Sequence, residues 1–259
     1  GVHFESVIDV LTMKMYKFGP DGKMETLDIP ESEADRAAEL QNELVEKAAE
    51  NDEKLMELFF ENDGLTEDEM RSGINAGLLS RGMFPVFCIS ARKDMGVGRL
   101  MQFITNVALS PNQMPAPKDA KGNEVACDPK APVNLFVFKT SVEQHIGEVV
   151  FFKVMSGILK EGMDLTNTTT QNKERISQIL VSAGKNRNKI ASLEAGDLGI
   201  TVKLKGTRFN HTLSEKDVAF GKIKLPEPKF RTAIRPLNEG DEEKLGEALN
   251  RMHQEDPTI

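Results

Sequence analysis

Tryptophan is missing from this sequence, and tyrosine, cysteine and histidine are scarce. The 259 residues include no Trp, one Tyr, two Cys and four His. Two cysteines, Cys88 and Cys127, are too few for a disulfide framework, and such sparse use is typical of a reducing, cytoplasmic setting. The histidines share no ligand spacing, so the sequence predicts no metal site. They are His3, His145, His211 and His253.

Long apolar runs are also missing. No stretch approaches the length of about 18 apolar residues that a transmembrane helix needs. The first residues, "GVHFESVIDV", lack the basic start and apolar centre of a signal peptide. The chain begins with Gly in place of Met, so we expect a processed or cloned fragment.

Motifs for chemistry are absent in the same way. No G-x-x-x-x-G-K-[ST] phosphate loop and no G-x-S-x-G nucleophile turn occurs, so the sequence predicts no catalytic residue. "NKER" (172–175) and "NKIA" (188–191) resemble the Asn-Lys-x-Asp guanine reader without its Asp, and we interpret them as strand and loop residues. The basic run "GKNRNKIA", with Lys185, Arg187 and Lys189, either grips phosphates or forms a solvated loop.

Charge is present in excess, and it is unevenly distributed. Residues 1–80 contain 20 acidic and 7 basic residues, whereas residues 131–220 contain 9 acidic and 12 basic residues. This asymmetry indicates two units with different partners. The acidic block is either a docking surface or a set of solvated helix faces, and both interpretations stay open.

Periodicity predicts an α/β first part. "FESVIDVLTMKMYKF" alternates like one or two strands, and apolar residues at helical spacing follow from Glu31. Thr66 and Glu69 have the spacing of a capping box at the start of a third helix. "MFPVFCIS" (83–90) is typical of a strand buried on both faces, and "VGRLMQFITNVAL" (97–109) of an amphipathic helix.

The remainder is predicted to be mostly β. Five prolines between residues 110 and 132 indicate a mobile linker with few contacts. Short strands separated by Gly turns then predict a small closed β-barrel filled by its own side chains. After "LPEP", a strand "KFRTAIRP" (229–236) leads to a helix with Leu245, Leu249 and Met252 facing inward.

The order of the segments resembles one known family along essentially the whole chain. "SG-x-L-x-x-G", "KERIS", "AGDLG" and "EDPT" follow one another at matching spacings after the three acidic helices. This looks like translation elongation factor G, the ribosomal translocase. The resemblance implies a multidomain α/β plus all-β protein. Residues 1–115 would be the end of a GTPase domain with an α/β insertion called G′, 116–222 a closed β-barrel, and 223–259 the first strand and helix of an α+β domain III.

The same resemblance implies a ligand and partners. In the longer parent protein, GTP or GDP binds with magnesium, and the guanine-contacting Ser-Ala falls on Ser90 and Ala91, with Arg92 next; no nucleotide is expected on this chain alone. From the residues, Ser90 can equally cap the following helix. The implied partner is the ribosome, with small-subunit RNA at the barrel, where Lys185, Arg187 and Lys189 are candidate contacts, and the large-subunit stalk protein at G′. A cytoplasmic monomer without membrane or DNA contacts is expected.

The sequence departs from the family at two turns, which leaves alternatives open. Ile89 precedes Ser-Ala where the family usually has Gly, and "EQHIG" replaces Asp-Pro-x-x-Gly at the first barrel turn. A main translocase, a divergent second copy, a tetracycline-protection factor and release factor three remain candidates. A different class also remains: a stand-alone adaptor that was never a GTPase and uses its acidic helical face. A phosphate loop upstream in the gene would exclude that adaptor.

Overall fold

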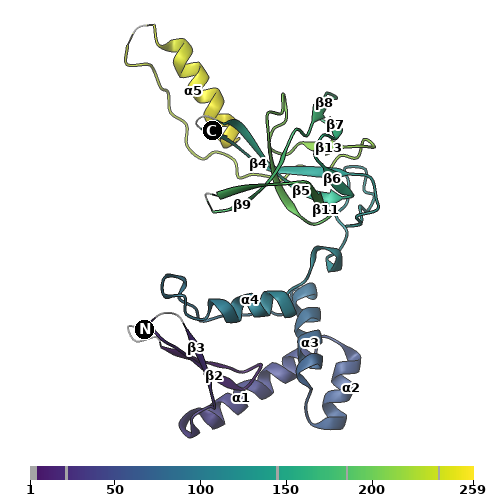
Figure 1. The fold of residues 1–259 in the computed structure, drawn as a ribbon, viewed down its shortest axis with the longest axis vertical. Coiled ribbons are helices and arrows are strands. Elements are labelled where there is room, and N and C mark those ends of the chain that lie inside the picture. Colours follow the sequence, from purple (N-terminus) through teal and green to yellow (C-terminus); the bar gives the residue numbers. More distant parts are fainter. Residues whose placement is uncertain (1–4, 21–22, 144–145, 185, 239) are drawn as a thin grey trace. The chain divides into compact units, whose positions relative to one another are not determined.

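The computed structural model describes residues 5–20, 23–143, 146–184, 186–238 and 240–259 (Figure 1). The chain forms two compact units, Gly1–Ser110 and Pro111–Ile259, called here the first and second unit. Of the residues described, no helix has the length and apolar character needed to cross a membrane.

The first unit combines a small antiparallel sheet with four α-helices, as the periodicity predicted. The sheet has the order β1-β2-β3, and β3 was not expected. The strands are β1 (Ser6–Asp9), β2 (Lys14–Phe18) and β3 (Met24–Leu27). The helices are α1 (Glu31–Ala49), α2 (Glu53–Asn62), α3 (Glu67–Ser80) and α4 (Val97–Asn106).

Local capping explains where two of these helices begin. The Asp52 side chain accepts hydrogen bonds from the first backbone N–H groups of α2. The predicted capping box is confirmed: the Glu69 N–H donates to Thr66 Oγ1 at 3.4 Å, and the Thr66 N–H donates to Glu69 Oε2 at 2.7 Å. Both devices satisfy N–H groups that a helix start leaves without partners.

The predicted buried strand at residues 83–90 is wrong. This segment has extended backbone without strand pairing, and Phe84 and Val86 are 78% and 89% exposed. Met83 packs against the core around Ile74, and the Phe87 ring lies 4.8 Å from that of Phe103 on α4. Pro85 has no N–H to donate, and the described part of this unit contributes no neighbouring strand to the segment. An apolar run without a partner strand keeps its extended form and remains exposed.

The second unit is built on an eight-stranded antiparallel sheet. Its order is β10-β9-β12-β5-β4-β13-β7-β8, beside a two-stranded β11-β6 ladder. The strands are β4 (Asn134–Glu143), β5 (Gly147–Ser156), β6 (Ile158–Lys160), β7 (Asp164–Asn167), β8 (Lys173–Arg175), β9 (Ile179–Ala183), β10 (Asn186–Ile190), β11 (Ser192–Glu194), β12 (Leu198–Val202) and β13 (Thr212–Ser214). The pairing of the described strands does not close, so the large antiparallel sheet is established and its closure into a barrel stays a prediction.

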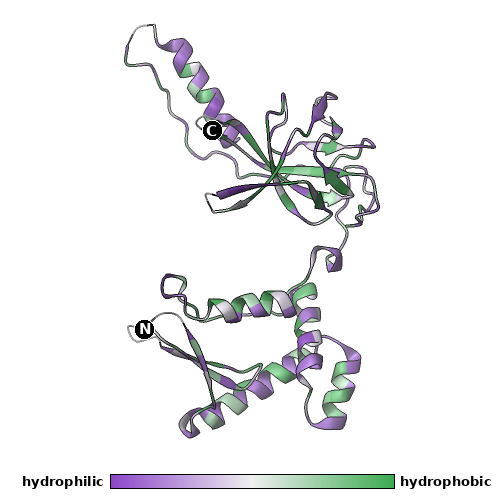
Figure 2. Cartoon of the chain, viewed as in Figure 1, coloured by the Kyte–Doolittle hydropathy of each residue, from purple (hydrophilic) through white to green (hydrophobic). Residues whose placement is uncertain are grey.

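The second unit has a main hydrophobic core and a smaller cluster formed by Val149, Ile200 and Val202. Leu135, Val137, Phe152, Ile176 and Leu213 are completely buried in the main core. Burying a side chain of this size stabilises the fold by about 1.5–3 kcal/mol. Figure 2 shows the matching pattern, with hydrophobic residues concentrated along β4 and β5. The strands therefore bury a core of their own side chains, and its enclosure by a closed barrel stays a prediction.

Residues 111–131 do not form the predicted linker with few contacts. Asp119 anchors a turn by accepting from the Lys121 and Asn123 N–H groups, at 2.9 and 2.8 Å. The Ala120 N–H donates to the Ala219 carbonyl at 2.7 Å, and the Gly157 N–H donates to the Asp128 carbonyl at 2.9 Å. Backbone groups therefore hold this proline-rich segment to the second unit, although it lacks an apolar pattern.

The last part of the chain matches the prediction only in its helix, α5 (Glu242–Glu255). Residues 229–236 are not a strand, because no described strand pairs with them. The expected inward position of the apolar side chains is also wrong: Leu249 and Met252 are 36% and 47% exposed. The C-terminal end of α5 is instead attached to β4, where Thr140 Oγ1 donates to the Gln254 carbonyl at 2.5 Å and the Val142 N–H donates to Glu255 Oε1 at 2.6 Å.

Two glycines of "SG-x-L-x-x-G" have positive φ angles but different surroundings. Gly157 has φ 80°, and a Cβ there would lie 2.7 Å from Val133 Cα and 2.8 Å from the Ala131 carbonyl oxygen. Gly162 has φ 86°, and its nearest neighbour would be the Arg175 guanidinium at 3.8 Å. Only glycine adopts such φ angles freely, and only at Gly157 does the close backbone also exclude a side chain.

We expect Gly157→Ala to destabilise the second unit by about 2–5 kcal/mol, from backbone strain and overpacking together. Gly162→Ala is the matched control, because it adds only the strain of about 1–2 kcal/mol. Urea unfolding followed by circular dichroism measures both. Equal losses for the two variants would contradict the close contact at Gly157.

Candidate functional site

The predicted guanine-contacting residues form a tight turn. The Ser90 N–H donates to the Met95 carbonyl at 2.9 Å, and the Met95 N–H donates to the Ser90 carbonyl at 3.0 Å. Between them lies a short 3-10 helix, Ala91–Lys93. Ser90 makes no capping hydrogen bond with its side chain, so the interpretation of Ser90 as a helix cap is wrong. The helix α4 starts later, with Gly96 at φ 74° as its N-cap, because the turn intervenes.

The first-unit sheet braces this turn. Met95 is buried against Tyr16 and Phe18 of β2. Four residues later, Arg99 Nη2 donates to Asp9 Oδ2 at 2.5 Å, and its guanidinium lies 4.4 Å from the centroid of the Tyr16 ring. An ion pair with each side chain about 20% exposed is better shielded from water than a surface pair. The sheet and α4 therefore hold the C-terminal end of the turn in place.

The turn is open to solvent on part of its surface. Ala91 and Arg92 are exposed and Ser90 is half-buried. The sequence supplies no phosphate loop, and the described residues contain no cluster of three His, Cys, Asp or Glu side chains able to hold a metal ion. Contact of this turn with a guanine base stays a prediction.

The basic run "GKNRNKIA" belongs to a β-hairpin, so the loop interpretation is wrong. Lys185 lies outside the described residues, whereas Arg187 and Lys189 lie on β10, which pairs with β9. Arg187 forms an ion pair with Glu143, and Lys189 Nζ lies 2.7 Å from Glu161 Oε1. An RNA phosphate at this hairpin would therefore compete with two carboxylates.

The glutamate of "KERIS" has a structural role that the sequence did not indicate. Glu174 is 2% exposed, yet its carboxylate is well satisfied. It accepts from the Lys205 N–H at 2.9 Å, from the Gly206 N–H at 2.9 Å and from Thr207 Oγ1 at 3.0 Å. These bonds fix the chain just before residues 208–211, which line a cavity.

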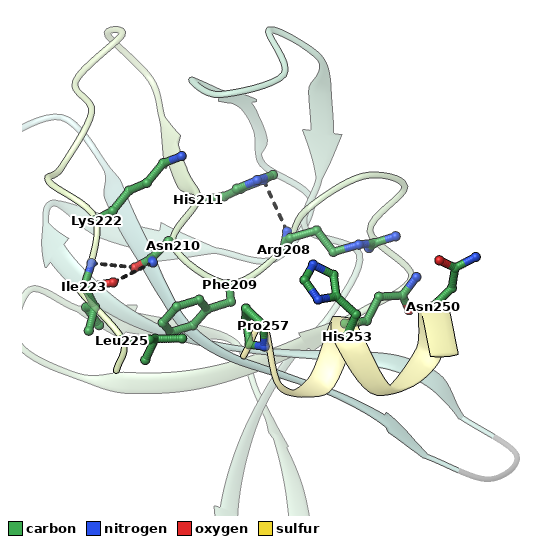
Figure 3. A pocket seen from close by; sticks show the side chains of 11 residues that line it. Arg208, Phe209, Asn210, His211, Lys222, Ile223, Leu225, Asn250, His253 and Pro257 are labelled. Carbon is green, nitrogen blue, oxygen red and sulfur yellow. Dashed lines mark hydrogen bonds between the residues drawn. The ribbon is translucent and has the colours of Figure 1, made fainter. Parts of the chain in front are cut away.

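That cavity has a volume of about 560 Å³ and lies in the second unit (Figure 3). Its walls are the loop 208–211, the extended segment 222–225 and the C-terminal half of α5. Sequence reasoning missed it, because no spacing motif links three segments so far apart in the chain. Two of the scattered histidines, His211 and His253, lie on its wall. His3 and His145 lie outside the described residues.

The hydrogen bonds that His211 accepts favour its neutral form, with Nε2 as the donor. Its Nδ1 lies 3.2 Å from the Arg208 N–H and 3.0 Å from Asn167 Nδ2, and both of these groups are donors. Nδ1 must therefore accept, which leaves the ring proton on Nε2. Burial lowers the pKa of His211, and the cations Arg208 and Lys222 lower this pKa further, against a smaller opposing effect of Glu174.

Comparisons with known proteins match most of the second unit and, in one structure, nearly the whole chain. Residues 132–216 match the family model of elongation factor G domain 2, and residues 225–259 match that of elongation factor G domain III. A crystal structure of a protein from Thermus thermophilus matches 98% of this chain, with 26% sequence identity and a TM-score of 0.81. This chain spans 37% of the length of that protein.

We expect the His211 imidazole to titrate below the ordinary histidine pKa of about 6.5. The folded state then binds fewer protons than the unfolded state, so this group reduces stability as pH falls below the unfolded value. Nitrogen-15 NMR of the imidazole measures the midpoint, and His211→Gln should remove this part of the acid sensitivity. A midpoint at or above 6.5 would contradict the described environment.

Proposed function

We propose, from the premise that this chain is an elongation-factor-G-like protein, that it is part of a translational GTPase that acts on the ribosome in GTP-dependent translocation of tRNA and mRNA. The observation that carries the proposal is the family order: domain 2 over residues 132–216 is followed at once by domain III over residues 225–259. Since the chain spans 37% of the matched structure, the proposed activity belongs to a longer protein.

In this proposal the turn at Ser90, Ala91 and Arg92 recognises the guanine base of GTP or GDP. When bound, GTP would supply the phosphoryl group and magnesium would neutralise its negative charge. In the longer protein, residues outside this chain would hold the phosphates and the magnesium. One or two hydrogen bonds from the turn contribute about 1 kcal/mol each, enough to select a base and not to bind a nucleotide alone. The brace by Met95 and Arg99 supports this role, since it keeps the turn in one geometry.

The sheet of the second unit is proposed to close into a small barrel that contacts small-subunit RNA. Arg187 and Lys189 are candidate phosphate contacts, with RNA replacing their present carboxylate partners. We propose that the protein is a monomer in the cytoplasm, where ribosomes operate. A divergent second copy and a ribosomal protection or release factor would share this architecture.

The acidic face of α1 in the first unit is proposed to contact a basic face of the ribosomal stalk protein. Glu39, Glu43 and Glu46 on α1, and Glu50 directly after it, are all exposed. Excess carboxylates on one helix raise the rate of encounter with a basic partner more than they raise the final affinity. The same exposed face also supports the second candidate function, an adaptor that binds a basic partner without any GTPase activity.

The longer protein containing this chain is expected to hydrolyse GTP slowly alone and much faster with ribosomes, and to move mRNA by one codon. Phosphate release and toeprinting measure the two activities. The 259-residue chain is the matched control and should neither bind GTP tightly nor hydrolyse it, because it lacks a phosphate loop. If ribosomes leave the rate of GTP hydrolysis by the longer protein unchanged, the proposal is refuted and the adaptor function is favoured.

Reversing charge at Glu39, Glu43 and Glu46 to Lys is expected to slow ribosome-stimulated turnover several-fold at low salt, with a smaller effect at high salt because ions screen exposed charges. The matched control reverses Glu53, Glu57 and Glu61 on α2, which changes the net charge equally. Both variants should unfold at the wild-type temperature. If the two variants slow turnover alike, the acidic face of α1 has no specific partner.

A further inference from the structure

We propose that the cavity formed by loop 208–211, segment 222–225 and α5 binds a nucleoside phosphate, with the phosphate near Arg208 and Lys222 and the flat ring against Phe209 (Figure 3). The cavity lies entirely within the second unit, so this inference does not depend on the proposed GTPase activity. Its volume of about 560 Å³ is within the range of small-molecule sites.

Two walls of the cavity are joined before any ligand arrives. Asn210 Nδ2 donates to the Ile223 carbonyl at 3.0 Å, and the Ile223 N–H donates to Asn210 Oδ1 at 2.8 Å, as the dashed lines of Figure 3 show. This two-bond clamp fixes the backbone next to Lys222. Asn210 itself has φ 66°, a left-handed conformation that asparagine tolerates better than most residues. A preformed wall lowers the ordering cost of binding.

The third wall is attached independently. The bonds from Thr140 and Val142 to the C-terminal end of α5 hold Asn250 and His253 at the cavity. His253 Nδ1 lies 2.7 Å from the Ile259 carbonyl oxygen, which can only accept, so Nδ1 donates there. Asn250 contributes an amide to the same wall.

The charge on the wall favours an anion. Arg208 is partly neutralised, because its Nη1 lies 2.8 Å from Glu148 Oε1. Lys222 has no carboxylate partner in the part of the chain that the structure describes. His211 adds a neutral Nε2–H donor rather than a third positive charge. One cation without a described carboxylate partner, one shared guanidinium and an imidazole N–H therefore line the cavity. In Figure 3 the Lys222 and Arg208 side chains extend to opposite sides of His211, so a phosphate beside His211 is reached by turning these long side chains towards it.

Part of the lining is apolar, which argues for more than a bare phosphate. Phe209, Leu225 and Pro257 line the cavity beside the cations. A base or other flat ring gains about 1–3 kcal/mol by stacking on an aromatic side chain, and the phosphate it carries would reach the donors. A free mononucleotide and one nucleotide unit of an RNA strand present this same chemistry.

Calorimetry on the 259-residue chain tests the proposal with inorganic phosphate, adenosine, AMP and a short oligouridylate. We expect AMP to bind at least tenfold more tightly than either phosphate or adenosine alone. Oligouridylate binding more tightly than AMP identifies an RNA strand as the source, and the reverse order identifies a free nucleotide. Failure of both to bind at millimolar concentration, or phosphate binding as tightly as AMP, would overturn the proposal.

Two lysine variants locate the site. Lys222→Ala is expected to weaken AMP or oligouridylate binding about tenfold, the effect of losing one charge-assisted hydrogen bond. Lys224→Ala removes the same charge two residues away, outside the cavity, and should change affinity less than twofold. Both residues are exposed, so folding should be unaffected. Equal losses for the two variants would show nonspecific attraction and reject the cavity as the site.

Discussion

The second unit depends on one buried carboxylate. Glu174 is nearly inaccessible to water, and its three donors all come from residues 205–207. Thr207, one of these donors, also receives a bond from Asn167 at 3.2 Å, and Asn167 in turn reaches His211. Loss of this charge, or of any partner, leaves polar groups buried without hydrogen bonds, at a cost of about 1–3 kcal/mol each. The position of the cavity loop follows from this network.

The sequence predicted local structure well and non-local structure less well. The capping box at Thr66 and Glu69 and the helices of the first unit follow from contacts between residues a few positions apart. The extended segments 83–90 and 229–236 were predicted as strands from composition alone. A strand needs hydrogen bonds from a neighbour, which a single apolar run cannot supply, and in this structure neither segment receives them.

The difference between local and non-local contacts also explains which features of the Ser90 turn and of the cavity the sequence did not reveal. Ser90 and Ala91 were assigned by resemblance to the family, but the support of their turn by Tyr16 and Asp9 joins segments far apart in the first unit. "KERIS" was recognised as a motif, whereas the role of its Glu174 required the partners 31 to 33 residues away. The cavity joins three distant segments, so only the fold brings Arg208, Lys222 and α5 together.

The unpaired segment 83–90 carries an exposed thiol, Cys88, and Cys127 on the second unit is half-buried. Phe84, Val86 and Cys88 are exposed, whereas Phe87 packs against Phe103 of α4. Any partner that covers this segment would slow alkylation of the Cys88 thiol. Cys88 is thus a built-in chemical reporter of whether this segment is bare or covered, with Cys127 as an internal reference in the same chain.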